Sequence, residues 1–169
     1  MNACRSQDSV SIRLAAPSDV DAVLALCREL YEFDGTPFHA DGHRAALVEL
    51  ISRPDCGCVW LIEVGAETIG YVVLCFGFSL EFRGRDAFVD EFYLREPFRR
   101  RGVGTEVMEQ VAREAQRLGV KALHLEVERT NTAAQAFYRK IGFKDHSRYL
   151  MTKWLQQGLA NGYNTTYSQ

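Results

Sequence analysis

A turn built from arginine and glycine, placed between a strand pattern and a helix pattern, constrains the fold of this chain more than any other feature. Residues 86–94, DAFVDEFYL, are rich in β-branched and aromatic side chains, as is typical of a strand. Residues 96–105 then read EPFRRRGVGT, and from Gly102 apolar residues recur at helical spacing as far as Leu118. The first N–H groups of a helix have no partner inside it, so this turn predicts an anion-binding site at the helix N-terminus.

The rest of the sequence predicts one mixed α/β (α+β) domain over residues 1–155, followed by a flexible polar tail over 156–169. Consecutive strands between residues 56 and 94 are joined by short turns, so we expect a mixed, mostly antiparallel central sheet flanked by helices. Strand patterns lie at residues 10–16, 56–64, 68–78, 86–94, 121–128 and 143–155. Helical patterns lie at residues 17–31, in a segment that ends before Pro54, at 102–118 and at 132–141. A loop pattern lies at residues 32–38.

The composition indicates a globular domain without a nucleic-acid or membrane partner. Of 169 residues, 47% are hydrophobic and 25% are charged, and the net charge of −2 lacks the positive excess expected of a nucleic-acid binder. The segment MNACRSQDSV has no apolar signal-peptide core, and no apolar run is long enough to span a bilayer. The five cysteines, an odd number without framework spacing, predict reduced thiols, no metal site and a cytoplasmic location.

Taken alone, the arginine–glycine turn leaves several interpretations to weigh. A P-loop needs Gly-Lys-Ser/Thr after a longer loop, and this sequence is absent. A dinucleotide-binding fingerprint needs a third glycine where Val107 stands. Two interpretations of the turn remain. It binds a different phosphate-bearing ligand, or it is a basic turn that contacts only solvent, and the turn by itself does not distinguish the two.

Three segments in a fixed order carry a resemblance to a known family. Arg99-x-x-Gly102-x-Gly104 at the strand-to-helix turn resembles the pyrophosphate-binding motif of the GNAT superfamily of acetyl-CoA-dependent N-acetyltransferases. VDEFYL before the turn is similar to the central strand of that family, and LHLEVERTNTAAQAFYRKIGF after it resembles the second cofactor-binding segment. The order of the predicted elements agrees over residues 10–155. The resemblance implies a single GNAT-type domain whose central strand splays away from its neighbour at the cofactor site.

The resemblance also implies the cofactor and the residues that hold it. Acetyl-CoA would be the co-substrate, with its diphosphate on the main-chain N–H groups of the turn and its pantetheine added like a strand against the backbone of Phe92 and Leu94. The implied cofactor-binding residues are Phe92, Tyr93, Leu94, Arg99, Arg100, Arg101, Gly102, Val103, Gly104, Thr105, Asn131, Ala134, Phe137 and Tyr138.

Acyl transfer from a thioester further requires an oxyanion donor, an acid and a base. A backbone N–H between Phe92 and Leu94 is the implied oxyanion donor. Tyr138, seven residues after Asn131, occupies the general-acid position of the family, although a core aromatic is the alternative for this residue. Asp90 and Glu91 are the candidate bases, and strand alternation predicts that they point to opposite faces, so that only one enters the site. An ion-paired or solvated carboxylate is the alternative for Glu91.

The acceptor is expected to be a small primary amine. Residues 77–94, GFSLEFRGRDAFVDEFYL, resemble the polyamine and diamine subgroup, and the loop YEFDGTPF at residues 31–38 would cover an acidic, aromatic pocket suited to a cation. A protein or peptide N-acetyltransferase and a non-catalytic acyl-CoA-binding module are the alternatives. A homodimer is expected as well, because SRYLMTKWL at residues 147–155 predicts an apolar strand near the sheet edge.

Overall fold

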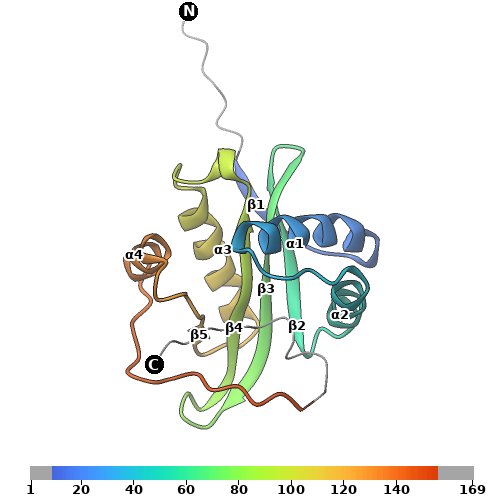
Figure 1. Ribbon diagram of the computed structural model, residues 1–169. Coiled ribbons are helices and arrows are strands. Elements are labelled where there is room, and N and C mark those ends of the chain that lie inside the picture. The colour runs from blue at the N-terminus through green and yellow to red at the C-terminus, as the bar shows by residue number, and fades with distance from the viewer. Residues whose placement is uncertain (1–8, 156–169) are drawn as a thin grey trace, which may run out of the picture.

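The computed structural model describes residues 9–155, so the predicted tail at 156–169 lies outside the described residues. These residues form a five-stranded sheet with helices on both faces (Figure 1). The elements in chain order are β1 (Val10–Leu14), the 3-10 turn η1 (Pro17–Asp19), α1 (Val20–Asp34), α2 (Ala40–Ser52), β2 (Gly57–Val64), β3 (Glu67–Ser79), β4 (Gly84–Leu94), the 3-10 turn η2 (Glu96–Phe98), α3 (Val103–Arg117), β5 (Leu123–His124) and α4 (Thr132–Lys140). No helix within 9–155 has the length and apolarity needed to cross a membrane.

The sheet is mixed and mostly antiparallel, as predicted. Its strand order is β1-β2-β3-β4-β5, with antiparallel pairs from β1 to β4 and a parallel pair between β4 and β5. The last pair is very short, because it joins only Ala87 to Leu123 and Phe88 to His124. Beyond Phe88, the β5 side of β4 therefore has no strand partner among the described residues, which is the splayed central strand that the sequence led us to expect.

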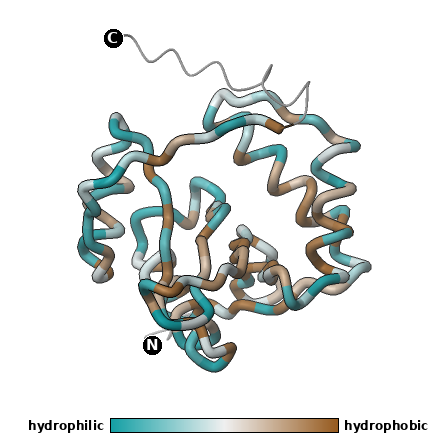
Figure 2. Tube along the Cα trace, turned by 90° about the horizontal axis from the view of Figure 1, so that it is seen from below, coloured by the Kyte–Doolittle hydropathy of each residue, from teal (hydrophilic) through white to brown (hydrophobic). Residues whose placement is uncertain are grey.

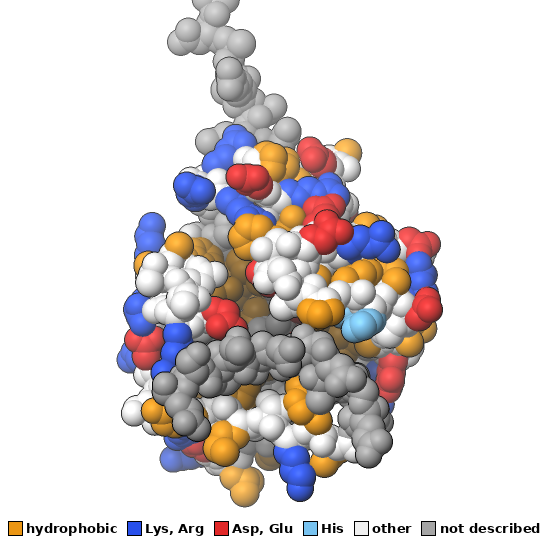
Figure 3. All heavy atoms as spheres, in the orientation of Figure 1, with side chains coloured by type: hydrophobic (Ala, Val, Ile, Leu, Met, Phe, Trp, Pro, Cys, Tyr) orange, Lys and Arg blue, Asp and Glu red, His pale blue; other side chains and the backbone are white. Residues whose placement is uncertain are grey.

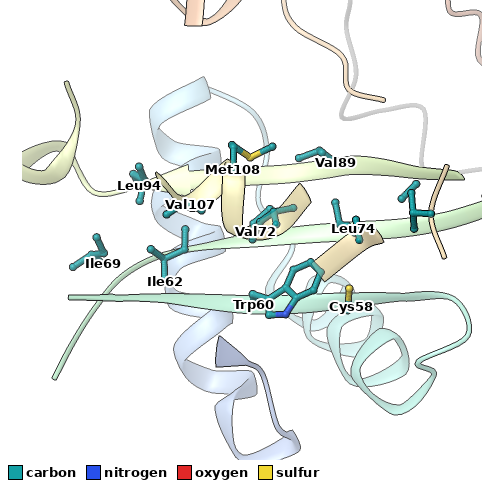
Figure 4. Close-up of a cluster of buried hydrophobic side chains, with 14 residues drawn as sticks. Cys58, Trp60, Ile62, Ile69, Val72, Leu74, Val89, Leu94, Val107 and Met108 are labelled. Atoms are coloured by element: carbon teal, nitrogen blue, oxygen red, sulfur yellow. The ribbon is translucent and has the colours of Figure 1, made fainter. Parts of the chain in front are cut away.

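Each face of the sheet carries its own hydrophobic cluster, because alternate residues of a strand point to opposite faces. On one face, α3 packs on side chains from β2, β3 and β4, and Figure 4 shows this cluster around Trp60, Val72 and Leu94. On the other face, α1 and α2 cover a cluster that includes Leu61 and the fully buried Tyr71. Both faces of β4 are thus covered, and only its side edge remains open.

The first helix is longer than predicted. α1 continues to Asp34, so the first residues of the expected loop at 32–38 are helical. Gly35 ends the helix in the left-handed region, with φ of 68°, and donates its N–H to Glu32. Glycine reaches this conformation at little cost, which explains why the helix stops there rather than earlier.

The predicted strand at residues 143–155 is wrong, and the strand predicted at 121–128 shrinks to β5. Residues 143–155 contain no helix or strand and run as a strap past the lower end of the sheet in Figure 1; Figure 2 shows the strap apart from the strands. Side chains hold it there, since Arg139 contacts Asp145 at 2.9 Å and Arg148 contacts Glu81 at 2.8 Å. An alternating segment forms a strand only when a neighbouring strand offers backbone partners, and a two-residue β5 offers almost none.

Candidate functional site

The turn between β4 and α3 presents unpaired backbone donors. Arg100 and Gly102 both adopt left-handed conformations, with φ of 58° and 85°. Thr105 and Glu106 make the first helical bonds, both to the carbonyl of Gly102, so the N–H groups of Gly102 and the two residues after it precede the helical ladder. Such an array of main-chain donors at a helix N-terminus favours an anion, as the sequence predicts.

Gly104 brings three elements together at the start of α3. A side-chain carbon at this position would lie 3.3 Å from the ring of Phe137 on α4 and 3.7 Å from Leu94 on β4. Phe137 in turn stacks on Phe92, with 6.4 Å between ring centroids. The absence of a side chain at Gly104 therefore allows α4 to approach the turn closely, next to the open edge of β4.

The three arginines of the turn differ in direction. Arg100 and Arg101 are exposed, and Figure 3 shows Lys and Arg side chains gathered at the upper end of the molecule, near this turn. Arg99 points back along β4, where its Nε donates to the carbonyl of Leu94 at 2.6 Å. Its guanidinium lies 4.2 Å from the centroid of the Phe33 ring on α1. The positive charge that faces outward thus comes from Arg100 and Arg101.

The open edge of β4 offers backbone groups to a ligand. Arg95, just past the strand, donates its N–H to the carbonyl of Ile69 in β3 at 2.9 Å. Because backbone groups of a strand alternate between its two sides, those of Phe92 and Leu94 face away from β3. The carbonyl of Leu94 already accepts the Nε–H of Arg99, so the groups left for an extended ligand are those of Phe92 and the N–H of Leu94. The side chain of Tyr93 points instead toward α1, where its hydroxyl donates to Glu29 at 3.3 Å.

A β-bulge in β4 changes where the two acidic side chains lie. Opposite β3, the strand has one extra residue, Asp90, between the pairings of Val89 and Glu91. The bulge interrupts the alternation, so our prediction that the two carboxylates occupy opposite faces does not apply at this point. Burial raises the pKa of Cys75 to about 11, and the charges of Asp90 and Glu91 both contribute. The two carboxylates therefore lie near the same thiol.

Glu91 is engaged inside the fold. The hydroxyl of Tyr71 donates to its Oε2 at 2.7 Å, and the thiol of Cys27 lies 3.7 Å from the same oxygen. Burial raises the pKa of Glu91, whereas hydrogen bonds from Tyr71 and Tyr31 lower it. These partners come from β3 and α1, so Glu91 joins the sheet to the helix that covers it.

Asp90 is the exposed carboxylate of the pair. Its side chain reaches solvent, yet neighbouring protein atoms exclude enough water to raise the pKa of the carboxyl. Across the gap where β5 leaves β4, burial raises the pKa of Glu126, and the charges of Asp90 and Glu128 raise it further. The negative charge of Asp90 thus disfavours ionisation of Glu126, and a cation in the gap would relieve this repulsion.

Tyr138 lies on the last turn of α4. Its ring contacts those of Phe137 and Phe143, with centroids 5.0 and 5.7 Å apart, and burial raises its pKa to about 12. Tyr138 also lines a cavity of about 1350 Å³ bordered by α3, α4, residues 120–130 and residues 143–150. Its lining includes no residue of β4 or of the arginine–glycine turn, but it includes Glu126 and Glu128, so the cavity adjoins the gap where β5 leaves β4.

Asn131 caps α4. Its Oδ1 accepts the N–H of Ala134 at 3.0 Å, which leaves the side-chain NH₂ as a donor and engages the Ala134 N–H within the helix cap. Val103 packs against the hydrophobic cluster under α3, and the N–H of Thr105 bonds to Gly102. Four of the predicted cofactor-binding residues therefore also have structural roles. They are Val103, Thr105, Asn131 and Ala134.

Several residues around the site were not predicted from the sequence. Glu126 and Glu128 alternate with apolar residues in HLEVE, and this period of two could have placed them together on one side. Tyr71 and Cys27 gave no comparable signal, because a buried tyrosine or cysteine in an apolar run looks like ordinary core. No cluster of His, Cys, Asp or Glu in residues 9–155 has the geometry of a metal site.

Comparisons with known proteins agree on one family. Residues 24–143 match the acetyltransferase (GNAT) family. The thialysine N-epsilon-acetyltransferase of Bos taurus is 26% identical over 151 residues, which cover 80% of this chain and 85% of that protein. An integron cassette protein from the Cole Harbour Salt Marsh metagenome is 34% identical, with a TM-score of 0.77 over 86% of this chain and 90% of that one. An aminoglycoside N-acetyltransferase in complex with CoA shares the fold, at 18% identity and a TM-score of 0.73 over 88% and 96% of the two chains.

Proposed function

The chain belongs to the acetyltransferase (GNAT) family and uses acetyl-CoA as co-substrate, and from this premise we propose that it acetylates a small primary amine, such as a diamine or polyamine. The observation that carries the proposal is the exposed carboxylate of Asp90 at the bulge of β4, whose negative charge also raises the pKa of Glu126. A cation is the ligand that lowers the repulsion between two neighbouring carboxylates. An alkyl amine is such a cation at neutral pH.

In the proposed complex the diphosphate of acetyl-CoA lies on the backbone N–H groups of Gly102 to Gly104, with Arg100 and Arg101 contributing charge. The pantetheine pairs with the backbone groups of Phe92 and with the N–H of Leu94, because the carbonyl of Leu94 already accepts from Arg99. This arrangement brings the thioester to the middle of β4, near the bulge. A backbone N–H of β4 then stabilises the oxyanion of the tetrahedral intermediate.

Tyr138 is the proposed proton donor to the departing thiolate. With a pKa raised to about 12, its hydroxyl stays protonated throughout the neutral range. A thiol has a pKa of about 8.5, so full proton transfer from Tyr138 to the thiolate is uphill by ~3.5 pKa units. Tyr138 therefore acts first as a hydrogen-bond donor that stabilises negative charge on sulfur.

Asp90 is the proposed partner of the acceptor amine. An amine with a pKa of about 10 is only ~0.1% neutral at pH 7, so a group that takes its proton assists the reaction. Loss of solvation raises the pKa of Asp90, which makes its carboxylate a better proton acceptor than an ordinary aspartate. Glu91, whose oxygens are occupied by Tyr71 and Cys27, supports this part of β4 from behind.

The names of the relatives support a small acceptor. One is named for the epsilon amine of thialysine, and one fold neighbour is named for aminoglycosides. Both names denote small compounds with amino groups. They favour a small amine over a protein acceptor for this chain, and the acidic gap favours an amine that carries positive charge.

Asp90→Asn tests the proposal, because it removes the negative charge and keeps the shape. We expect the amine KM to rise about tenfold, equivalent to ~1.4 kcal/mol, with little change in the affinity for CoA. Asp86→Asn on the same strand is the matched control, since the Asp86 carboxylate lies 3.5 Å from His124 rather than in the gap. An unchanged amine KM in the Asp90 variant would contradict the role of this carboxylate.

We further propose a homodimer formed through residues 147–155 and a cytoplasmic location. Tyr149, Leu150 and Met151 are exposed on the strap, and Met151 is 90% exposed. Consecutive large apolar side chains at a surface are typical of an interface. The unpaired thiols of Cys27, Cys56, Cys58 and Cys75 support a reducing compartment.

A further inference from the structure

Arg99 contacts two different elements with one side chain. Its Nε donates to the carbonyl of Leu94 at the end of β4. Its guanidinium lies over the ring of Phe33, 4.2 Å from the centroid, and 5.2 Å from the centroid of the Tyr93 ring. A flat guanidinium can stack on an aromatic ring and donate in its own plane at the same time, which an ammonium cannot do. The side chain therefore links the last turn of α1 to the end of β4.

This link continues a contact made one turn earlier on α1. Glu29 pairs with Arg95 at 2.7 Å and accepts from the hydroxyl of Tyr93. Glu29 and Phe33 are four residues apart and lie on one face of α1, so the two contacts together align the end of the helix along β4. Phe33 is 63% exposed, so the core does not hold its ring, and its ring contacts the guanidinium of Arg99.

The end of α1 also reaches the acidic part of β4. Cys27 and Tyr31, both on α1, contact Glu91, which is adjacent to Asp90. Asp34 is the last residue of the helix. The charge of Arg99 lowers the pKa of its carboxyl, and the charge of Glu128, across the gap, raises it. A shift of the α1 end would therefore move several groups that surround Asp90.

We propose that Arg99 is a positioning residue for the acceptor, whose side chain holds the end of α1 against β4 instead of binding the diphosphate of CoA. The inference rests on the proposed function, because it takes the gap beside Asp90 as the acceptor site. The backbone of Arg99 belongs to the cofactor turn, so cofactor binding at the turn and the position of α1 are connected through this one residue. Arg100 and Arg101, which are exposed, supply the charge for the diphosphate, although Arg101 also donates to the carbonyl of Pro97 at 3.3 Å.

The effect of Arg99 on the pKa of Asp34 agrees with a positioning role for Arg99. Partial burial raises the pKa of the Asp34 carboxyl, the positive charge of Arg99 lowers it, and Glu128 raises it again. Arg99 thus favours the ionised form of a carboxylate at the rim of the acidic gap. Loss of Arg99 would reduce both the alignment of α1 and the negative charge that attracts a cation.

Two variants of Arg99 separate positioning from phosphate binding. Arg99→Met removes the charge and Arg99→Lys keeps it, but both remove the planar stacking and the Nε donor. We expect both to raise the amine KM about tenfold and to change the Kd of CoA, measured by calorimetry, by no more than about twofold. Arg100→Met is the control on the same turn, and it should weaken CoA binding severalfold without changing the amine KM at saturating acetyl-CoA.

Phe33→Leu gives a second, independent measurement that does not touch the turn. We expect it to reproduce the rise in amine KM, and the Arg99→Met/Phe33→Leu double variant to be no worse than the single ones, because all remove the same contact. Additive effects would contradict the proposal. So would an Arg99→Met variant that loses CoA affinity as Arg100→Met does, with Arg99→Lys restoring it. The calorimetric comparison needs no acceptor, so it still decides the role of Arg99 if the small-amine proposal fails.

Discussion

Burial of its ring determines which proton chemistry Tyr138 can perform. The pKa of about 12 keeps the hydroxyl neutral, so in the proposed reaction it donates a hydrogen bond and does not act as a base. The family resemblance singled out this position, but the pKa could not be predicted, because the packing of Tyr138 against Phe137 and Phe143 depends on how α4 meets the following residues. The same is true of Asp90. The sequence shows that this residue is acidic, but it does not predict the β-bulge on which Asp90 lies.

Tyr138→Phe should lower kcat by about tenfold to a thousandfold while the Kd of CoA stays nearly unchanged, because only the proton donor is lost. The pH dependence gives a further expectation. A tyrosine with a pKa near 12 is protonated both at pH 7 and at pH 9, so the ratio of the two enzymes' rates should be the same at both values. Steady-state kinetics with chemistry shown to be rate-limiting provide the measurement. An unchanged kcat would make Tyr138 a packing residue.

At the scale of elements, local patterns predicted most of the architecture. The β4 strand, the turn and α3 follow from alternation, left-handed glycine and helical spacing, all of which act within a few residues. The bulge at Asp90 depends on the register against β3, and no local pattern encodes that register. The segment 143–155 alternates like a strand, yet it pairs with no strand among the described residues. Long-range pairing therefore decided the elements that the sequence predicted incorrectly.

The strap bears directly on the proposed dimer. Light scattering of the purified chain at micromolar concentration should give twice the mass of one 19.1 kDa chain. Leu150→Lys with Met151→Lys should shift the protein toward the monomer, because two charges would then enter an apolar interface. Val48→Lys, a change at an exposed apolar residue on α2, should leave the mass unchanged. A monomeric wild-type chain would reject the dimer.

At the scale of the whole molecule, the proposed cofactor and acceptor sites lie along one strand. The turn before α3 lies at one end of β4, the acidic gap lies beside the bulge in its middle, and α1 and α4 border the open edge on opposite sides (Figure 1). The short pairing with β5 is what leaves this edge free. A longer β5 would cover the backbone groups of Phe92 and Leu94, so the splay of the sheet is the feature on which the proposed chemistry depends.

The most direct test of this account is an assay of CoA-thiol release from acetyl-CoA over a panel of acceptors. The panel should contain putrescine, spermidine, lysine, an aminoglycoside and peptides with free N-termini, with the acetylated product identified by mass spectrometry. The account predicts turnover with at least one small cationic amine, at a kcat/KM well above that of any peptide. Turnover confined to peptides, with every small amine inert, would contradict the proposed acceptor.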